Sequence, residues 1–456
     1  MNNNNSSPVI ERSHYSTAYL IYVLTILFLG TTLSFADRQL INILVEPIKN
    51  EFNASDTQMG LLTGLAFVLF YATLSVPIAR LADRGSRRNI LVIAMALWSV
   101  MTAFCGISTS FLQLAIARFG VGVGEAGGGP ASYSMIADYF SPQRRNTAFG
   151  ILAAGAPFGI LLSMYGGAVV ATHYGWRTTF LGLGIPGILL AIAIRLTVRE
   201  PQRGRWDNAQ QDLNQQPLPQ LSIHQVLLLL WRNPAMRTVA LASGVTAISG
   251  FAAGAWLPSF FMRVHGLSLI EAGLSLGLGG TLGGMLGGIV GGVLADRLSK
   301  RHASWQLKIA ALGTLLSLPA QSLVLLWPQG DYFAIGSSNL PIAVLLVPLG
   351  AFFMAFMQGP AVAAIQNLAA PEIRTQATAA FFFVTSALGM GLGPLSVGLL
   401  NDALTPLLAT NSVRYGLLAS LLFMLLGGLL FWRAGHFYAL VLSSRAASLN
   451  PSAPRF

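Results

Sequence analysis

The chain is a succession of long apolar runs separated by short polar breaks. Runs longer than about 18 residues, enough to cross a bilayer as a helix, recur along its whole length. With glycine, proline and charge clusters taken as breaks, the pattern predicts twelve spans, at residues 18–48, 55–80, 88–109, 111–139, 143–172, 176–198, 236–262, 268–294, 305–327, 340–368, 373–401 and 412–434. An all-α polytopic membrane protein is therefore expected, because backbone groups in lipid must be hydrogen-bonded within their own segment.

The longest polar break divides the predicted spans into two sets of six. It covers residues 199–221, is rich in glutamine, and has the composition of a linker. An amphipathic stretch at 223–231 is expected to lie along the membrane surface. The predicted organisation lists an N-terminal tail (1–17), a six-helix bundle (18–198), a linker (199–235), a second six-helix bundle (236–434) and a C-terminal tail (435–456).

The charged residues are few and unevenly placed. They make up 9% of the chain, against about 25% in a soluble domain. The net charge of +11 does not indicate nucleic-acid binding, because the basic residues punctuate the apolar runs instead of forming a patch. With the N-terminus inside, most of the 27 lysines and arginines fall on the inner side, and the outer loops hold Lys49, Arg177, Arg263 and Arg414. This asymmetry predicts cytoplasmic termini in a plasma membrane, and we expect a bacterial inner membrane.

Two loops with related sequences reveal an internal repeat. Residues 80–88 read RLADRGSRR after the second span, and residues 293–301 read VLADRLSKR after the eighth. Two parallel six-span halves are a known plan of secondary transporters, with the substrate site near the midplane between the halves.

The first of these loops resembles the signature of the major facilitator superfamily between spans two and three. The usual leading glycine is Ala79 here, whereas Gly292 supplies it in the second half. The resemblance implies the twelve-helix major facilitator fold and an inner gate in which the loops latch the halves together. The gate residues it implies are Asp83, Arg84, Arg87, Arg88, Asp296 and Arg297. A charge cluster that only sets membrane topology is the alternative.

Four ionisable residues lie inside the predicted spans and away from their ends, where an unpaired charge costs several kcal/mol. Asp37 and Arg38 lie in the first span, and Arg118 and Glu125 lie in the fourth. A rise of about 1.5 Å per residue places both pairs at one level, a little outside the midplane. Arg118 and Glu125 are two turns apart and share a helix face, whereas Asp37 and Arg38 point about 100° apart. We expect one carboxylate to pair with an arginine and the other to exchange protons.

These residue types suggest two roles. Arginine stays charged, so Asp37 and Glu125 are the candidates for proton coupling. Glu125 is the first choice, because the glycines around it allow close helix approach and so favour removal of water. Arg38 or Arg118 could hold an anionic group by two parallel hydrogen bonds. A static ion network that only joins spans one and four is the alternative.

The same residues suggest a subfamily. Phe35-Ala36-Asp37-Arg38, together with Arg118 and Glu125-Ala126, resembles the spinster-like lipid transporters. The resemblance implies a lysophospholipid or sphingolipid-like substrate. The second half carries neutral and aromatic residues at the corresponding depth, among them Phe251, Trp256, Phe260, Phe261 and Gln321. We expect them to form an apolar wall for the hydrocarbon chain, with helix packing as the alternative for each.

The sequence therefore predicts a proton-coupled secondary transporter of an amphiphile, with a carrier of a small organic anion or drug as the alternative. An enzyme is not expected, since no nucleophile–base pair or metal cluster is visible and all six histidines fall in tails or near span ends. No cofactor and no nucleic-acid partner are expected. The expected partners of this monomer are its substrate, protons and membrane lipids.

Overall fold

The computed structural model describes residues 15–206, 223–335, 338–370 and 373–449, and nearly all of them are helical. The helices of the first half are α1 (Thr17–Ile43), α2 (Val45–Phe52), α3 (Asp56–Gly60), α4 (Ala66–Arg84), α5 (Arg87–Ile107), α6 (Phe111–Glu125), α7 (Gly128–Tyr139), α8 (Pro142–Leu161), α9 (Gly167–Tyr174) and α10 (Trp176–Thr197). Two π-helical turns, η1 (Leu61–Leu65) and η2 (Leu162–Gly166), join α3 to α4 and α8 to α9.

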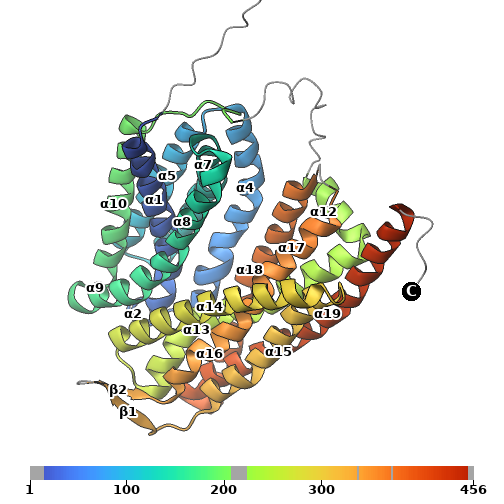
Figure 1. Cartoon of the computed structure of the whole chain (residues 1–456). Coiled ribbons are helices and arrows are strands. Elements are labelled where there is room, and N and C mark those ends of the chain that lie inside the picture. The colour runs from blue at the N-terminus through green and yellow to red at the C-terminus, as the bar shows by residue number, and fades with distance from the viewer. Residues whose placement is uncertain (1–14, 207–222, 336–337, 371–372, 450–456) are drawn as a thin grey trace, which may run out of the picture.

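The second half follows the linker, of which residues 207–222 lie outside the described residues. Its helices are α12 (Ile223–Arg232), α13 (Pro234–His265), α14 (Leu269–Ser299), α15 (Trp305–Leu326), α16 (Ala343–Met354), α17 (Gln358–Leu368), α18 (Arg374–Leu408) and α19 (Ser412–Leu449), with the 3₁₀ turns η3 (Ala355–Met357) and η5 (Ala409–Asn411). In Figure 1, helices α1 to α10 gather on one side of the molecule and α12 to α19 on the other. Helix α19 continues to Leu449, well past the end expected at residue 434.

A small β-hairpin departs from the purely helical expectation. Strand β1 (Tyr332–Ile335) pairs antiparallel with β2 (Ser338–Pro341), and Tyr332 lies opposite Pro341. The tyrosine, phenylalanine and isoleucine of β1 favour extended structure. We call the end of the molecule that carries this hairpin the hairpin end. The opposite end, where basic loops join α4 to α5 and α14 to α15, is the basic end.

Nine stretches in the described part of the chain are long and apolar enough to cross a membrane, and three of them, residues 142–174, 343–368 and 376–444, each include two consecutive α-helices. Helices α4, α6 and α7 of the first half are not among the nine. Helix α4 follows the π-helical turn η1, and α6 stops at Glu125 before α7 resumes at Gly128. The protein is thus an all-helical polytopic membrane protein whose first half contains broken helices.

The apolar core shows where the two halves meet. One cluster contains residues of both halves, among them Leu40, Met59 and Met164 of the first half and Trp256 and Val397 of the second. Two other clusters lie largely within one half each. Glycines permit the close approach: a side chain at Gly60 or Gly64 would collide with the backbone of α18, and one at Gly273 with that of η2. The halves are therefore packed together toward the hairpin end.

Candidate functional site

The carboxylate of Asp37 is held inside the first half by two other helices. Arg118 on α6 donates from Nη1 to Asp37 Oδ2 at 3.0 Å, and Thr102 on α5 donates to Asp37 Oδ1 at 2.7 Å. The side chains of Arg118 and Asp37 are only 1% and 2% exposed. A buried pair of this kind depends on full hydrogen bonding to offset the loss of water. Both oxygens of Asp37 are engaged, which leaves it a closed ion pair.

The second pair joins Arg38 to Glu125 and has a different environment. Arg38 donates from Nε to Glu125 Oε2 at 2.7 Å, with Nη2 at 2.5 Å from the same oxygen. The Arg38 side chain is 18% exposed, whereas that of Glu125 is fully buried. The other carboxylate oxygen, Oε1, has no hydrogen-bond partner among the described residues. This pair is therefore reachable from solvent at the arginine and incompletely bonded at the acid.

Aromatic rings surround the accessible arginine. The Arg38 guanidinium lies 4.7 Å from the ring centre of Tyr71, 5.1 Å from that of Phe35 and 5.2 Å from that of Phe67. Such cation–π contacts stabilise a guanidinium that is partly removed from water. They also fix the plane of the group, so that one edge faces Glu125.

The broken fourth span explains how Glu125 reaches this position. Ser110 caps α6 by accepting a hydrogen bond from the Gln113 amide, and the helix then runs to Glu125. The glycines that follow, beginning at Gly127, have low helix propensity and separate α6 from α7. A side chain at Gly124 would collide with the backbone of Trp98 on α5, so the glycine permits close contact of α6 and α5 beside the acid.

The structure pairs both carboxylates with arginines, where the sequence led us to expect one pair and one unpaired acid. Asp37 and Arg38 point in different directions on α1, so each takes a different partner on α6. The helix rise correctly predicted that the four residues lie at a similar depth, but which of them pair depends on how α1 and α6 are rotated against each other.

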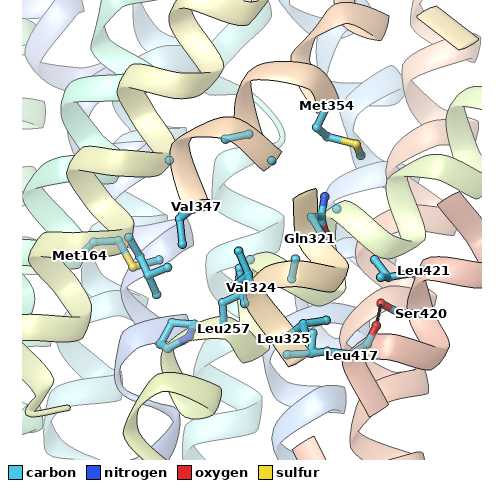
Figure 2. Close-up of a pocket in the computed structure, with 18 of the residues that line it drawn as sticks. Met164, Leu257, Gln321, Val324, Leu325, Val347, Met354, Leu417, Ser420 and Leu421 are labelled. Atoms are coloured by element: carbon cyan, nitrogen blue, oxygen red, sulfur yellow. Dashed lines mark hydrogen bonds between the residues drawn. The ribbon is translucent and has the colours of Figure 1, made fainter. Parts of the chain in front are cut away.

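A cavity of about 260 Å³ lies mostly within the second half and borders the first. Its wall is aliphatic, with Leu257, Val324 and Val347 among the lining residues, and Gln39, Gln321 and Ser420 are its polar side chains (Figure 2). Gln39 follows Arg38 on α1. None of the four intramembrane charges lines this cavity, and Gln39, the neighbour of Arg38 in sequence, is the lining residue next to them in the chain.

The expected aromatic wall is wrong for most of its residues. Trp256, Phe260 and Phe261 are almost completely buried in the shared apolar core, and the Trp256 indole donates to the Pro394 carbonyl of α18 at 2.9 Å. Of the residues proposed for the wall in the sequence analysis, Gln321 lines the cavity. The aromatic rings stabilise packing between helices, and small and aliphatic residues leave the open space.

The residues of the basic loops contact their own half. Arg87 forms ion pairs with Asp138 at the end of α7 and with Glu200 in the linker, and the Arg88 amide donates to Glu200 at 2.8 Å. Asp296 and Arg297 are exposed on α14. The side chains of Asp83 and Arg84 lie outside what the structure describes.

Sequence analysis missed Glu200 and Asp138, which meet at Arg87. Partial burial favours the protonated form of Glu200, but hydrogen bonds from the Arg88 amide, the Ser86 hydroxyl and the Arg87 guanidinium outweigh it and lower the pKa of this carboxyl below its usual value. The position of Glu200 directly after the sixth apolar run was the only signal in the sequence.

The hairpin end carries an ion network that joins the halves, which sequence reasoning also missed. Arg263 of α13 donates to Glu46 of α2 at 2.9 Å and to both carboxylate oxygens of Asp56 of α3, at 2.6 and 2.9 Å. Lys49 also pairs with Asp56. From α18, Asp402 accepts hydrogen bonds from the first amides of α3, those of Asp56 and Thr57, at 2.9 and 2.8 Å. The N-terminal end of α3 is thus fixed to two helices of the second half, α13 and α18.

Comparisons with known proteins agree with this architecture. Residues 27–394 match the family model of the Major Facilitator Superfamily. An MFS-type efflux pump of Mycolicibacterium smegmatis is 33% identical over 416 residues, covering 91% of this chain and 92% of that protein. Protein spinster homolog 1 of Xenopus tropicalis is 28% identical over 262 residues, covering 54% of this chain and 47% of that protein.

A solved structure resembles the fold along nearly its whole length. The crystal structure of a bacterial homologue of the human lysosomal transporter spinster, in an inward-facing and unoccupied conformation, has a TM-score of 0.82 and 27% identity, covering 93% of this chain and 98% of that chain. The resemblance inferred from the loop and from the intramembrane charges is confirmed. The chain belongs to the Major Facilitator Superfamily, is a secondary transporter and not an enzyme, and has bacterial spinster homologues among its structural neighbours.

Proposed function

We propose that this protein is a proton-coupled carrier of an amphiphilic anion, a lysophospholipid or sphingolipid-like molecule. Arg38 binds the charged headgroup and the aliphatic cavity receives the hydrocarbon chain. The observation that carries the proposal is the contrast within one ion pair: Arg38 is partly exposed, and Glu125 is fully buried with one oxygen unpartnered.

The coupling step follows from that contrast. An anionic headgroup that binds Arg38 competes with Glu125 for the same guanidinium edge. A carboxylate that loses its counter-ion in a water-poor site holds a proton more tightly. Headgroup binding at Arg38 and proton binding at Glu125 therefore favour each other, which is the linkage that symport of the proton and the anion requires. Asp37 and Arg118 hold α1 against α6 and provide a second site at which a proton can bind.

In a carrier that alternates between inward- and outward-open states, each end of the molecule faces one side of the membrane. We propose twelve membrane crossings, with the basic end and both termini in the cytoplasm of a bacterial cell. The halves are joined at the hairpin end by Arg263, Asp56 and Glu46. This arrangement resembles the inward-facing state of the spinster homologue. The latch of Asp83, Arg84, Arg87 and Arg88 with Asp296 and Arg297 would then form when the basic end closes.

A carrier of a small organic anion or drug is the second candidate. The similarity to an efflux pump over nearly the whole chain favours it, and Arg38 could equally bind a carboxylate. The aliphatic cavity favours the amphiphile, because a small polar solute would find few hydrogen-bonding partners among its lining residues.

The test uses purified protein in liposomes, with a fluorescent lysophosphatidylglycerol and, separately, benzoate as probes. Glu125→Gln should abolish uptake driven by a pH gradient while leaving counterflow exchange intact, because glutamine keeps the volume and loses the proton site. Glu51→Gln is the matched control, since Glu51 pairs with Arg177 near the surface. Unchanged gradient-driven uptake by the Glu125 variant would remove the assignment, and transport of benzoate alone would favour the second candidate.

A further inference from the structure

A partly buried arginine at the hairpin end has an empty binding edge. Arg414 lies in the first turn of α19, and its Nε and Nη2 atoms are buried with no hydrogen-bond partner in the described part of the chain. These two N–H groups form the edge of a guanidinium that binds a carboxylate by parallel hydrogen bonds. An arginine is charged at any physiological pH, so N–H groups of its guanidinium that are removed from water without a hydrogen-bond acceptor cost free energy of folding.

In three other arginines of this protein, the Nε and Nη2 groups have hydrogen-bond or ion-pair partners. Nε and Nη2 contact Glu125 in Arg38, the Ser108 carbonyl in Arg177, and Glu46 and Asp56 in Arg263. In Arg414 both Nε and Nη2 are without a partner among the described residues, which distinguishes it from these three. In Arg118 and Arg145, Nε is also buried without a partner in the described chain, but a terminal nitrogen of each donates a hydrogen bond, to Asp37 and to the Ala137 carbonyl respectively.

A second unpartnered group lies against the same aromatic ring, that of Phe260. His265, the last residue of α13, is 4% exposed, and neither ring nitrogen has a hydrogen-bond partner among the described residues. The Phe260 ring contacts both groups, with its centre 5.3 Å from that of the imidazole and 6.0 Å from the Arg414 guanidinium carbon. The Tyr332 hydroxyl of the β-hairpin donates to the His265 carbonyl at 3.2 Å and covers this turn.

The carboxylates that the structure pairs at the hairpin end are bonded to other groups. Asp56 and Glu46 bind Arg263, Glu51 binds Arg177, and Asp402 caps α3. In the described chain, Arg414 therefore has donors on a buried edge, a neighbouring imidazole able to donate one more, and no ion-paired acid.

We propose that Arg414 and His265 form a binding site for a small monovalent anion, a halide or formate-sized carboxylate. The anion accepts from the Nε and Nη2 groups of Arg414 and from one ring N–H of His265. The unpartnered nitrogen atoms of both groups are buried, which favours a small ion. Because Arg263 lies in the same last turn of α13, a bound anion would also stabilise the helix end that carries the ion network between the halves.

The test measures thermal unfolding of the purified full-length protein while sodium chloride replaces sodium gluconate at constant sodium. The wild type should show a saturable rise in Tm with chloride, and formate should reproduce it, because a ligand of the folded state stabilises it by mass action. Arg414→Gln should lose this dependence. His265→Phe, which keeps the ring contacts, should raise the half-saturating chloride concentration roughly tenfold. Arg177→Gln is the matched control and should respond as the wild type does.

A second measurement gives its main result on the wild type alone. Line broadening in the ³⁵Cl NMR spectrum of chloride should report exchange with the wild-type site, and formate should reverse it by competition. The broadening should decrease in His265→Phe. If the wild type shows no saturable response, water alone occupies the space and the proposal is overturned. An equal response in wild type and Arg414→Gln would overturn it too, since the anion would then bind elsewhere.

Discussion

Arg263 joins the two halves at the hairpin end, so its removal should shift the equilibrium between closed and open states there. Arg263→Met keeps much of the side-chain length and removes the charge. It leaves Asp56, which is almost completely buried, with Lys49 as its ion-pair partner, and leaves Glu46 without the arginine. When the hairpin end opens, water can reach these acids, so the loss of Arg263 penalises mainly the closed state.

The size of the shift follows from the burial of the pairs. Breaking a buried ion pair by removing one partner costs about 3–5 kcal/mol. The Arg263 side chain is 12% exposed and Lys49 remains on Asp56, so we reduce this to about 2–3 kcal/mol. Such a change alters the ratio of closed to open molecules by roughly 30- to 150-fold. A closed fraction of about 99% would fall to roughly 40–75%.

The assay is a distance measurement between nitroxide labels by double electron–electron resonance. Suitable sites are Tyr174 in the first half and Leu407 in the second, which are 73% and 82% exposed, on a Cys105→Ser background that removes the single native thiol. The longer-distance population should grow in Arg263→Met. In Arg177→Met it should not, because Arg177 pairs with Glu51 within the first half. Identical distance distributions in wild type and Arg263→Met would refute the reasoning.

Two further predictions concern the cavity and the basic end. Gly254→Leu should reduce binding of a lysolipid several-fold, as measured by isothermal titration calorimetry, and should leave binding of a short-chain headgroup analogue unchanged. The reason is that Gly254 lines the cavity and a side chain there meets nothing within 4 Å, so the leucine enters the cavity. Gly182→Leu is the control, because this glycine is equally open but lies outside the cavity. Glu200→Gln should cost about 1 kcal/mol of stability at pH 7. The pKa of Glu200 is lowered in the folded protein, so this stabilisation is present above the usual carboxyl pKa of 4.5 and is lost as the pH falls through the lowered value. The difference in Tm between wild type and Glu200→Gln should therefore narrow on acidification. A difference in Tm that is independent of pH would contradict the assignment.

Hydropathy and spacing predicted the class of protein and the depth of its four intramembrane charges. The lengths of the apolar runs reflect the thickness of a bilayer, and the rise per residue converts position into depth. Both are properties of a segment by itself, so they can be read without knowing its neighbours. The repeated loop motif likewise identified the superfamily.

Pairing across helices could not be predicted in this way. Depth placed Asp37, Arg38, Arg118 and Glu125 together, but the partner of each depends on the rotation of α1 against α6. The break after Glu125 was visible only as a run of glycines, whose effect on the helix depends on the close contact of α6 with α5.

The sequence by itself determined a helical membrane transporter in two repeated halves, with acid and base on the first. The tertiary structure decided which residues join the halves, as Arg263 and Asp56 do across more than 200 positions. It also placed Trp256, Phe260 and Phe261 in the core, whereas the sequence had led us to expect them in the cavity wall. Arg414 and His265 came to lie against the same aromatic ring, that of Phe260, with no acid among the described residues to match the arginine. The physical reason is that membrane insertion depends on the average polarity of one segment, whereas ion pairs and cavities depend on the rotation and separation of several helices at once.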